Sequence, residues 1–75
     1  MLMPGDIAYI AKPTLAQSAS TLQERWLKYP TFGLVIARTK KVFVSSGVDW
    51  DFVHIMTDGT IYIVPERCCS NASEL

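Results

Sequence analysis

DFVHIMTDGTIYIVP, residues 51–65, is the stretch that does most to decide the fold. Two runs rich in Val, Ile, Phe and Tyr flank Asp58-Gly59. A type I′ turn needs positive φ at both central residues, which Asp tolerates and Gly adopts freely. The stretch therefore predicts a β-hairpin with a two-residue loop, in which Thr57 faces Thr60.

This register divides the side chains of the hairpin between two faces. One predicted face carries Phe52, His54, Met56, Ile61 and Ile63. The opposite predicted face carries Val53, Ile55, Tyr62 and Val64. Both sets are largely apolar and a lone hairpin is marginal in water, so we expect the rest of the chain to close around this one.

Size and charge narrow the functional classes. The chain has 75 residues, 49% of them hydrophobic, and seven Lys plus Arg balance seven Asp plus Glu. We expect one domain over residues 1–69 and a frayed polar tail over residues 70–75. A net charge of zero gives no overall attraction to nucleic acid or to an anionic membrane. Because a chain this short buries only about 60% of its unfolded surface, we expect a protein partner or self-association to add stability.

The sequence also bears on the compartment. No run approaches the roughly 18 consecutive apolar residues of a membrane span, and residues 1–4 have neither a basic nor a long apolar leader region. We therefore expect a cytoplasmic protein that does not contact a membrane. Cys68 and Cys69 are adjacent, and a bond between neighbours closes a strained ring. We expect no structural disulfide, but one buried and one exposed thiol.

Two other strands are predicted. Residues 7–11 follow a Pro-Gly-Asp turn signal and end at Lys12-Pro13. Residues 32–44 form a longer, bent strand, and Gly33 inside it indicates a bend or a close backbone approach. Residues 45–47 are the predicted turn that leads into the hairpin.

Residues 14–31 show no strand pattern and are expected to form a long loop with a short helical turn. Thr21-Leu22-Gln23-Glu24 fits a capping box, which places Leu22 and Trp26 on one helical face. After the hairpin, Pro65 stops the ladder and residues 65–68 are predicted to form a 3₁₀ turn.

Together these elements predict an all-β fold, an SH3-like, partly open small β-barrel of about five strands with a long first loop. The residues Pro4-Gly5-Asp6, Gly33-Leu34-Val35-Ile36, Thr57-Asp58-Gly59 and Val64-Pro65-Glu66 are arranged along the chain as turn and strand signals. In this order they resemble the SH3-like small barrels, including short uncharacterised proteins of tailed phages. The resemblance implies the fold and a phage origin.

No set of residues predicts an active site, a metal site or a cofactor. His54 is the only histidine, and its neighbours by register are apolar, so we expect a half-buried, hydrogen-bonded core residue rather than a base. Asp49 and Asp51 lie two apart on one strand. Two oxygen donors make a poor cation site, which favours solvated loop charges. We therefore predict a protein that is not an enzyme.

A basic cluster and an aromatic set remain as candidate binding residues. Arg38, Lys40 and Lys41 lie near Phe43, a combination able to grip a phosphate backbone and stack on a base, or simply to guard a strand edge.

The second set is Trp26, Tyr29 and Phe32. These three aromatics lie within seven residues. Together with the other aromatic residues of the chain, they are more than so small a barrel can bury. Trp26 is expected either in the core or at an interface, and Tyr29 at an interface.

The sequence favours a non-enzymatic protein-interaction module that docks into a larger assembly, as a phage accessory or virion structural component. The unpaired edge strand is a second surface for such docking. A small nucleic-acid-binding barrel, and a phage inhibitor of a host protein, are the alternatives.

Overall fold

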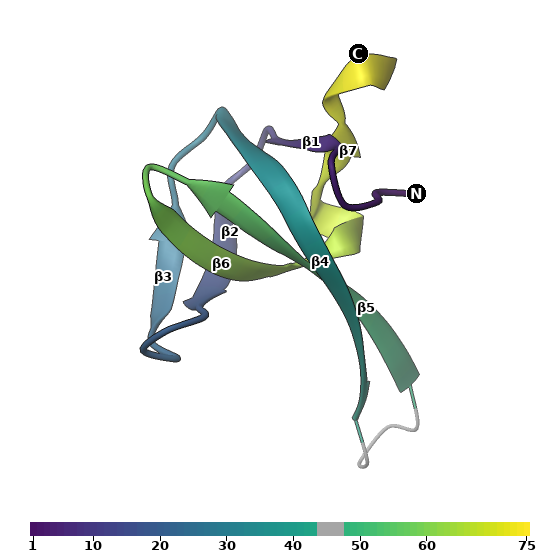
Figure 1. Ribbon diagram of the computed structural model, residues 1–75. Helices are drawn as coiled ribbons and strands as arrows, with labels where there is room; N and C mark the ends of the chain where they lie inside the picture. Colours follow the sequence, from purple (N-terminus) through teal and green to yellow (C-terminus); the bar gives the residue numbers. More distant parts are fainter. Residues whose placement is uncertain (44–47) are drawn as a thin grey trace.

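The fold is one antiparallel sheet, seen in a computed structural model that describes residues 1–43 and 48–75 and the side chains of residues 1–40 and 50–75 (Figure 1). Within these residues the strands are β1 (Ile7–Ile10), β2 (Thr14–Ser18), β3 (Glu24–Leu27), β4 (Thr31–Phe43), β5 (Val48–Thr57), β6 (Thr60–Pro65) and β7 (Ser70–Asn71). Two 3₁₀ turns, η1 (Glu66–Cys68) and η2 (Ala72–Glu74), flank β7. The strand order is β3-β2-β6-β5-β4-β1-β7.

The all-β prediction is confirmed, whereas the prediction of about five strands is wrong. The described residues form seven, because residues 14–31 supply β2 and β3 and the end of the chain supplies β7. The sheet is open, with β3 and β7 as its end strands. In Figure 1 these two strands lie on opposite sides of the molecule, and both chain termini lie near β7.

The predicted hairpin is confirmed in its turn and register. Asp58 has φ +50° and Gly59 has φ +74°, as a type I′ turn requires. Thr57 lies opposite Thr60, and the pairing continues without a shift as far as Phe52 and Pro65. The predicted turn at residues 45–47, at the other end of β5, lies outside the described residues.

One face of the sheet, here called the inner face, holds the core. Among the side chains that the structure describes, the buried apolar ones are Leu2, Ala8, Ile10, Ala16, Leu27, Val35, Val53, Ile55 and Val64. Ile10 on β1 and Leu27 on β3 belong to the same cluster, although four strands lie between β1 and β3 in the strand order. The sheet must therefore curl around a single core, so that its other face, the outer face, points away from it. The expectation that both faces of the hairpin are covered does not hold within the described residues, since Met56 on the outer face is 41% exposed.

The expected loop with a helical turn over residues 14–31 is wrong. This segment forms the hairpin β2–β3, and β2 also pairs with β6, where Ser18 lies opposite Tyr62. Leu22 has φ +60°, which no right-handed helix contains, and the Thr21 hydroxyl accepts from the N–H of Gln23 rather than from that of Glu24. A one-turn helix is marginal in water, and the ladder with β6 satisfies more backbone groups.

Residues 70–75, expected as a frayed tail, lie against the start of the chain instead. Ser70 and Asn71 pair with Tyr9 and Ala8. The Asn71 side chain donates to Asp6 Oδ2 at 3.1 Å and accepts from the Ser73 N–H at 3.0 Å, which caps η2. This polar segment stays in place because its backbone extends the sheet.

Two further predictions are confirmed, the close approach at Gly33 and the 3₁₀ turn after Pro65. Gly33 is buried opposite Ala8, and a Cβ at this position would lie 3.1 Å from Ile55 Cβ and Cδ1, so the close backbone approach is real. The 3₁₀ turn predicted after Pro65 is η1. Among the helical segments of the described chain, none has the length and hydropathy that crossing a membrane requires.

Candidate protein-interaction surface

An apolar row crosses four neighbouring strands on the outer face. The backbone register places Ile7 on β1 opposite Leu34 on β4, Leu34 opposite Met56 on β5, and Met56 opposite Ile61 on β6. Residues directly opposite one another in a ladder share a face of the sheet. Ile7, Leu34, Met56 and Ile61, here called the outer row, therefore stand side by side. Ile7 and Met56 are each 41% exposed, Leu34 is 36% exposed and Ile61 is half-buried.

Aromatic and aliphatic side chains extend the row along β4. The rings of Tyr9 and Phe32 lie opposite each other on β1 and β4, with centroids 4.9 Å apart, and Phe32 is 54% exposed. In the other direction the ladder between β4 and β5 has a bulge between Val35 and Ala37, and the extra residue, Ile36, is 38% exposed. The outer row and these flanking residues carry no charge.

The three predicted interface aromatics are all exposed but do not form one patch. Trp26 is 69% exposed, Tyr29 is 58% exposed and Phe32 is 54% exposed. Trp26 lies on β3, opposite Leu15 on β2, whereas Phe32 lies on β4. Three strands separate β3 from β4 in the strand order. Of the two positions considered for Trp26, the exposed one is found. Phe32 joins the outer row, and Trp26 belongs to the edge of the sheet.

Of the predicted basic cluster, the structure describes the side chains of Arg38 and Lys40. The Arg38 guanidinium is bonded to both carboxylate oxygens of Glu66 and to the carbonyl of Leu2. Lys40 lies at an exposed position, opposite Asp51 on β5. The side chains of Lys41 and Phe43 lie outside the described residues.

The ion pair of Arg38 and Glu66 has a structural role. The side chains are only 20% and 21% exposed, and Glu66 Oε2 also accepts from the Leu2 N–H at 3.0 Å. Its hydrogen bond to Arg38 holds the pKa of Glu66 below the usual value, and the same bond raises the pKa of Arg38. The pair fixes η1 and the start of the chain to β4, so this arginine is occupied within the fold.

Of the polar residues weighed for catalysis or metal binding, the structure describes the side chains of His54 and Asp51. His54 is half-buried and its Nε2 lies 3.3 Å from Thr39 Oγ1, as expected, but it is not among the residues of the core cluster. Asp51 is exposed, and the side chain of Asp49 lies outside the described residues. Across residues 1–43 and 48–75, no three His, Cys, Asp or Glu side chains gather as metal ligands would.

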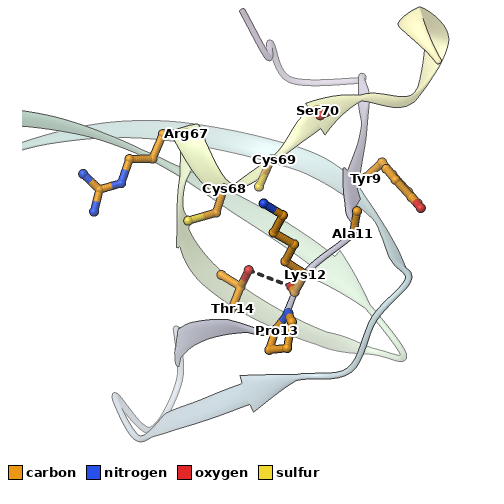
Figure 2. Close-up of a pocket in the computed structure, with 9 residues that line it drawn as sticks. All are labelled: Tyr9, Ala11, Lys12, Pro13, Thr14, Arg67, Cys68, Cys69 and Ser70. Atoms are coloured by element: carbon orange, nitrogen blue, oxygen red, sulfur yellow. Dashed lines mark hydrogen bonds between the residues drawn. The ribbon is translucent and has the colours of Figure 1, made fainter.

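A shallow cleft of about 420 Å³ lies between the β1–β2 connection and η1, and Figure 2 shows Lys12, Cys68 and Cys69 meeting in it. Both thiols are free. Cys68 is exposed, whereas Cys69 is half-buried and its Sγ donates to the Pro65 carbonyl at 3.7 Å. Burial above all, with the nearby charges of Cys68 and Glu66, raises the pKa of Cys69 to about 12. Cys69 is therefore a thiol at neutral pH and a poor nucleophile.

Comparison of the chain with protein-family models, with curated proteins and with solved structures gave no match. The outer row therefore has to be interpreted from its own chemistry.

Sequence reasoning missed the outer row as a unit. The residues were visible one strand at a time, because Met56 and Ile61 share a face of the predicted hairpin and Ile7 alternates with Ala8. What was missing is the pairing of β1 with β4 and of β4 with β5. Alternation within a strand gives the face of a side chain but not the strand that lies beside it.

Proposed function

We propose that this chain is a non-enzymatic interaction module of SH3-like, partly open barrel type, which docks its outer row onto another protein of a larger assembly. The observation that carries the proposal is the outer row itself, four uncharged side chains at one level of four adjacent strands. The curled sheet around one core supports the barrel part of the proposal.

Apolar contact is the chemistry that the outer row offers. Burying exposed apolar surface is favourable by about 25 cal/mol per Å², and this gain must exceed the conformational entropy that the side chains lose on binding. The partner surface should therefore be apolar at its centre, with its polar groups at the rim. Phe32, with its large exposed ring, is the anchor we expect at one end of the contact.

The biological setting is proposed from the resemblance to tailed-phage proteins. An accessory or virion structural component would use the outer row to join a particle, and an inhibitor of a host protein would use the same surface on a different partner. A nucleic-acid role has less support, because Arg38 is bonded to Glu66 and the net charge is zero.

A photo-crosslinking amino acid at position 56 tests the proposal. In cells that contain the natural partner, we expect one discrete adduct from position 56 and none from the matched exposed position 73 on η2. The adducted protein is then identified and the complex is rebuilt from two purified chains.

In that purified complex, Met56→Lys should weaken binding about tenfold or more, equivalent to roughly 1.4 kcal/mol, because a charge would be buried in an apolar contact. Ser73→Lys should leave the affinity unchanged. Equal adducts from positions 56 and 73, or equal affinities of the two variants, would refute docking through the outer row.

A further inference from the structure

The edge strand β3 presents a regular set of backbone groups to solvent. It is the last strand of the sheet and, among the described residues, it pairs with β2 alone. The Ser18 N–H donates to the Gln23 carbonyl at 2.9 Å, which is one of the two bonds of a hydrogen-bonded pair. Such pairs recur at every second residue of an antiparallel ladder. Arg25 and Leu27 therefore direct their backbone groups to β2.

The intervening residues direct theirs outwards. By the same alternation, the N–H and C=O groups of Glu24 and Trp26 point away from β2, towards the free edge. Lys28 directly follows the last residue of β3, and its carbonyl accepts from the Thr31 hydroxyl. The side chains of Glu24 and Trp26 share the outer face, where Trp26 is 69% exposed. The edge thus carries a negative, an aromatic and a positive side chain at equal spacing, which is a pattern that complements its own reverse.

We propose that β3 pairs antiparallel with β3 of a second copy of this chain, about a two-fold axis at Trp26. In this register Trp26 faces the Trp26 of the other copy, and Glu24 faces Lys28 of the other copy on both sides of the axis. The outward-pointing backbone groups of Trp26 and Glu24 then form hydrogen bonds across the dimer. The pairing joins two sheets into one, as β-augmentation does elsewhere.

Charge selects this register over its neighbours. A shift of two residues in one direction places Arg25 opposite Arg25 of the other copy, and like charges directly opposite are destabilising. A shift in the other direction places Glu24 opposite Pro30, which has no N–H to donate. A shift of one residue sets outward-pointing groups against groups already bonded to β2.

The charges on this edge have an alternative interpretation as guards against strand pairing, a common use of lysine. A guard repels a second copy of itself. Here the two charges have opposite signs and stand at equal distances from Trp26, so the reversed strand attracts. The contact involves only a few residues on each side, and we expect a weak dimer that a larger assembly would reinforce.

This inference rests on the proposed function only in that self-association is one form of docking, because the β3 edge and the outer row are different surfaces. Sedimentation velocity at low ionic strength, over concentrations up to about 1 mM, should show a reversible monomer–dimer equilibrium for the unmodified chain. Glu24→Lys and Lys28→Glu, each tested alone, should raise the dissociation constant about tenfold or more, since each sets two like-charged pairs in the dimer.

The double variant Glu24→Lys with Lys28→Glu exchanges the charges and should restore dimerisation to within a few-fold. Arg25→Gln is the control for register: it should change the affinity little here, but would strengthen a dimer in which Arg25 faces itself. A chain that stays monomeric, single variants that dimerise normally, or a double variant that stays monomeric would each overturn the proposal.

The two proposals fail separately. A monomeric chain that still binds its partner through position 56 removes the β3 dimer and keeps the proposed function. If the chain dimerises with the expected charge dependence but its Met56→Lys variant binds the partner normally, the β3 dimer is kept and the proposed function is removed. Circular dichroism and thermal unfolding of each variant establish that the sheet is intact.

Discussion

Replacing Gly33 by alanine tests the close packing of β4 on the core. Gly33 is buried opposite Ala8, and a Cβ there would lie 3.1 Å from both Cβ and Cδ1 of Ile55 and 3.4 Å from its Cγ1. These contacts are tighter than ordinary van der Waals separations of about 3.5–4.0 Å. Ile55 is 0% exposed, so it cannot relieve these contacts by moving out into solvent.

The expected loss of stability follows from these contacts. Overpacking a filled core costs about 1–3 kcal/mol, and the reduced freedom of the unfolded chain on changing Gly to Ala returns about 0.4–1 kcal/mol. The net destabilisation should be about 1–2 kcal/mol. For a domain of this size, 1 kcal/mol corresponds to about 4–8 °C in Tm, so we expect a fall of roughly 5–15 °C.

The measurement is urea unfolding of a double-mutant cycle. Ile55→Val removes the crowded Cδ1 and should cost about 0.5–1.5 kcal/mol by itself. In the double variant the methyl group added at position 33 fills part of the space vacated, so the two losses should be less than additive by about 0.5–1 kcal/mol. A Gly33→Ala variant as stable as the unmodified chain, or strictly additive losses, would show that β4 is not packed as described.

Two predictions concern pH. The pKa of Glu66 is lowered by its bond to Arg38. The stabilisation from this ion pair is therefore present above the unfolded pKa of 4.5 and is lost as the pH falls through the lower folded pKa. In urea unfolding, Glu66→Gln should destabilise the fold by about 1–3 kcal/mol at pH 7 and should make stability depend less on pH in the acid range. The pKa of Cys69 is raised from 9.0 to about 12, so the unfolded chain loses this proton first and stability should fall between these values. Cys69→Ala should remove this part of the fall in unfolding free energy at alkaline pH. If the unfolding free energy of the variant falls with pH as steeply as that of the unmodified chain, the burial of this thiol is contradicted.

Local chemistry was sufficient to predict the hairpin. The Asp58-Gly59 pair specifies a two-residue turn, and the turn sets the register of every pair from Thr57 and Thr60 outwards. The 3₁₀ turn after Pro65 was predicted for a similar reason, since proline has no N–H to donate to a ladder, and Pro65 is the last residue of β6. In each case the deciding interactions lie within a few residues of one another along the chain.

The β2–β3 hairpin was missed because tertiary pairing overrode a local signal. Thr21 to Glu24 fits a capping box, but Ser18 pairs with Tyr62, far away in the sequence, and draws the segment into the sheet. The exposed positions of Trp26 and Leu22 follow from this pairing, since neither side chain reaches the core. The proposed β3 edge exists only because this segment became a strand.

The sequence by itself determined that the chain is an all-β domain seeded by one tight turn, because strand alternation and turn conformation are properties of neighbouring residues. Only the tertiary structure decided which strands lie side by side, and hence that Ile7, Leu34, Met56 and Ile61 form one row while Arg38 is bonded to Glu66. Strand order depends on contacts between residues far apart in the chain, and these carry no signature in any local pattern.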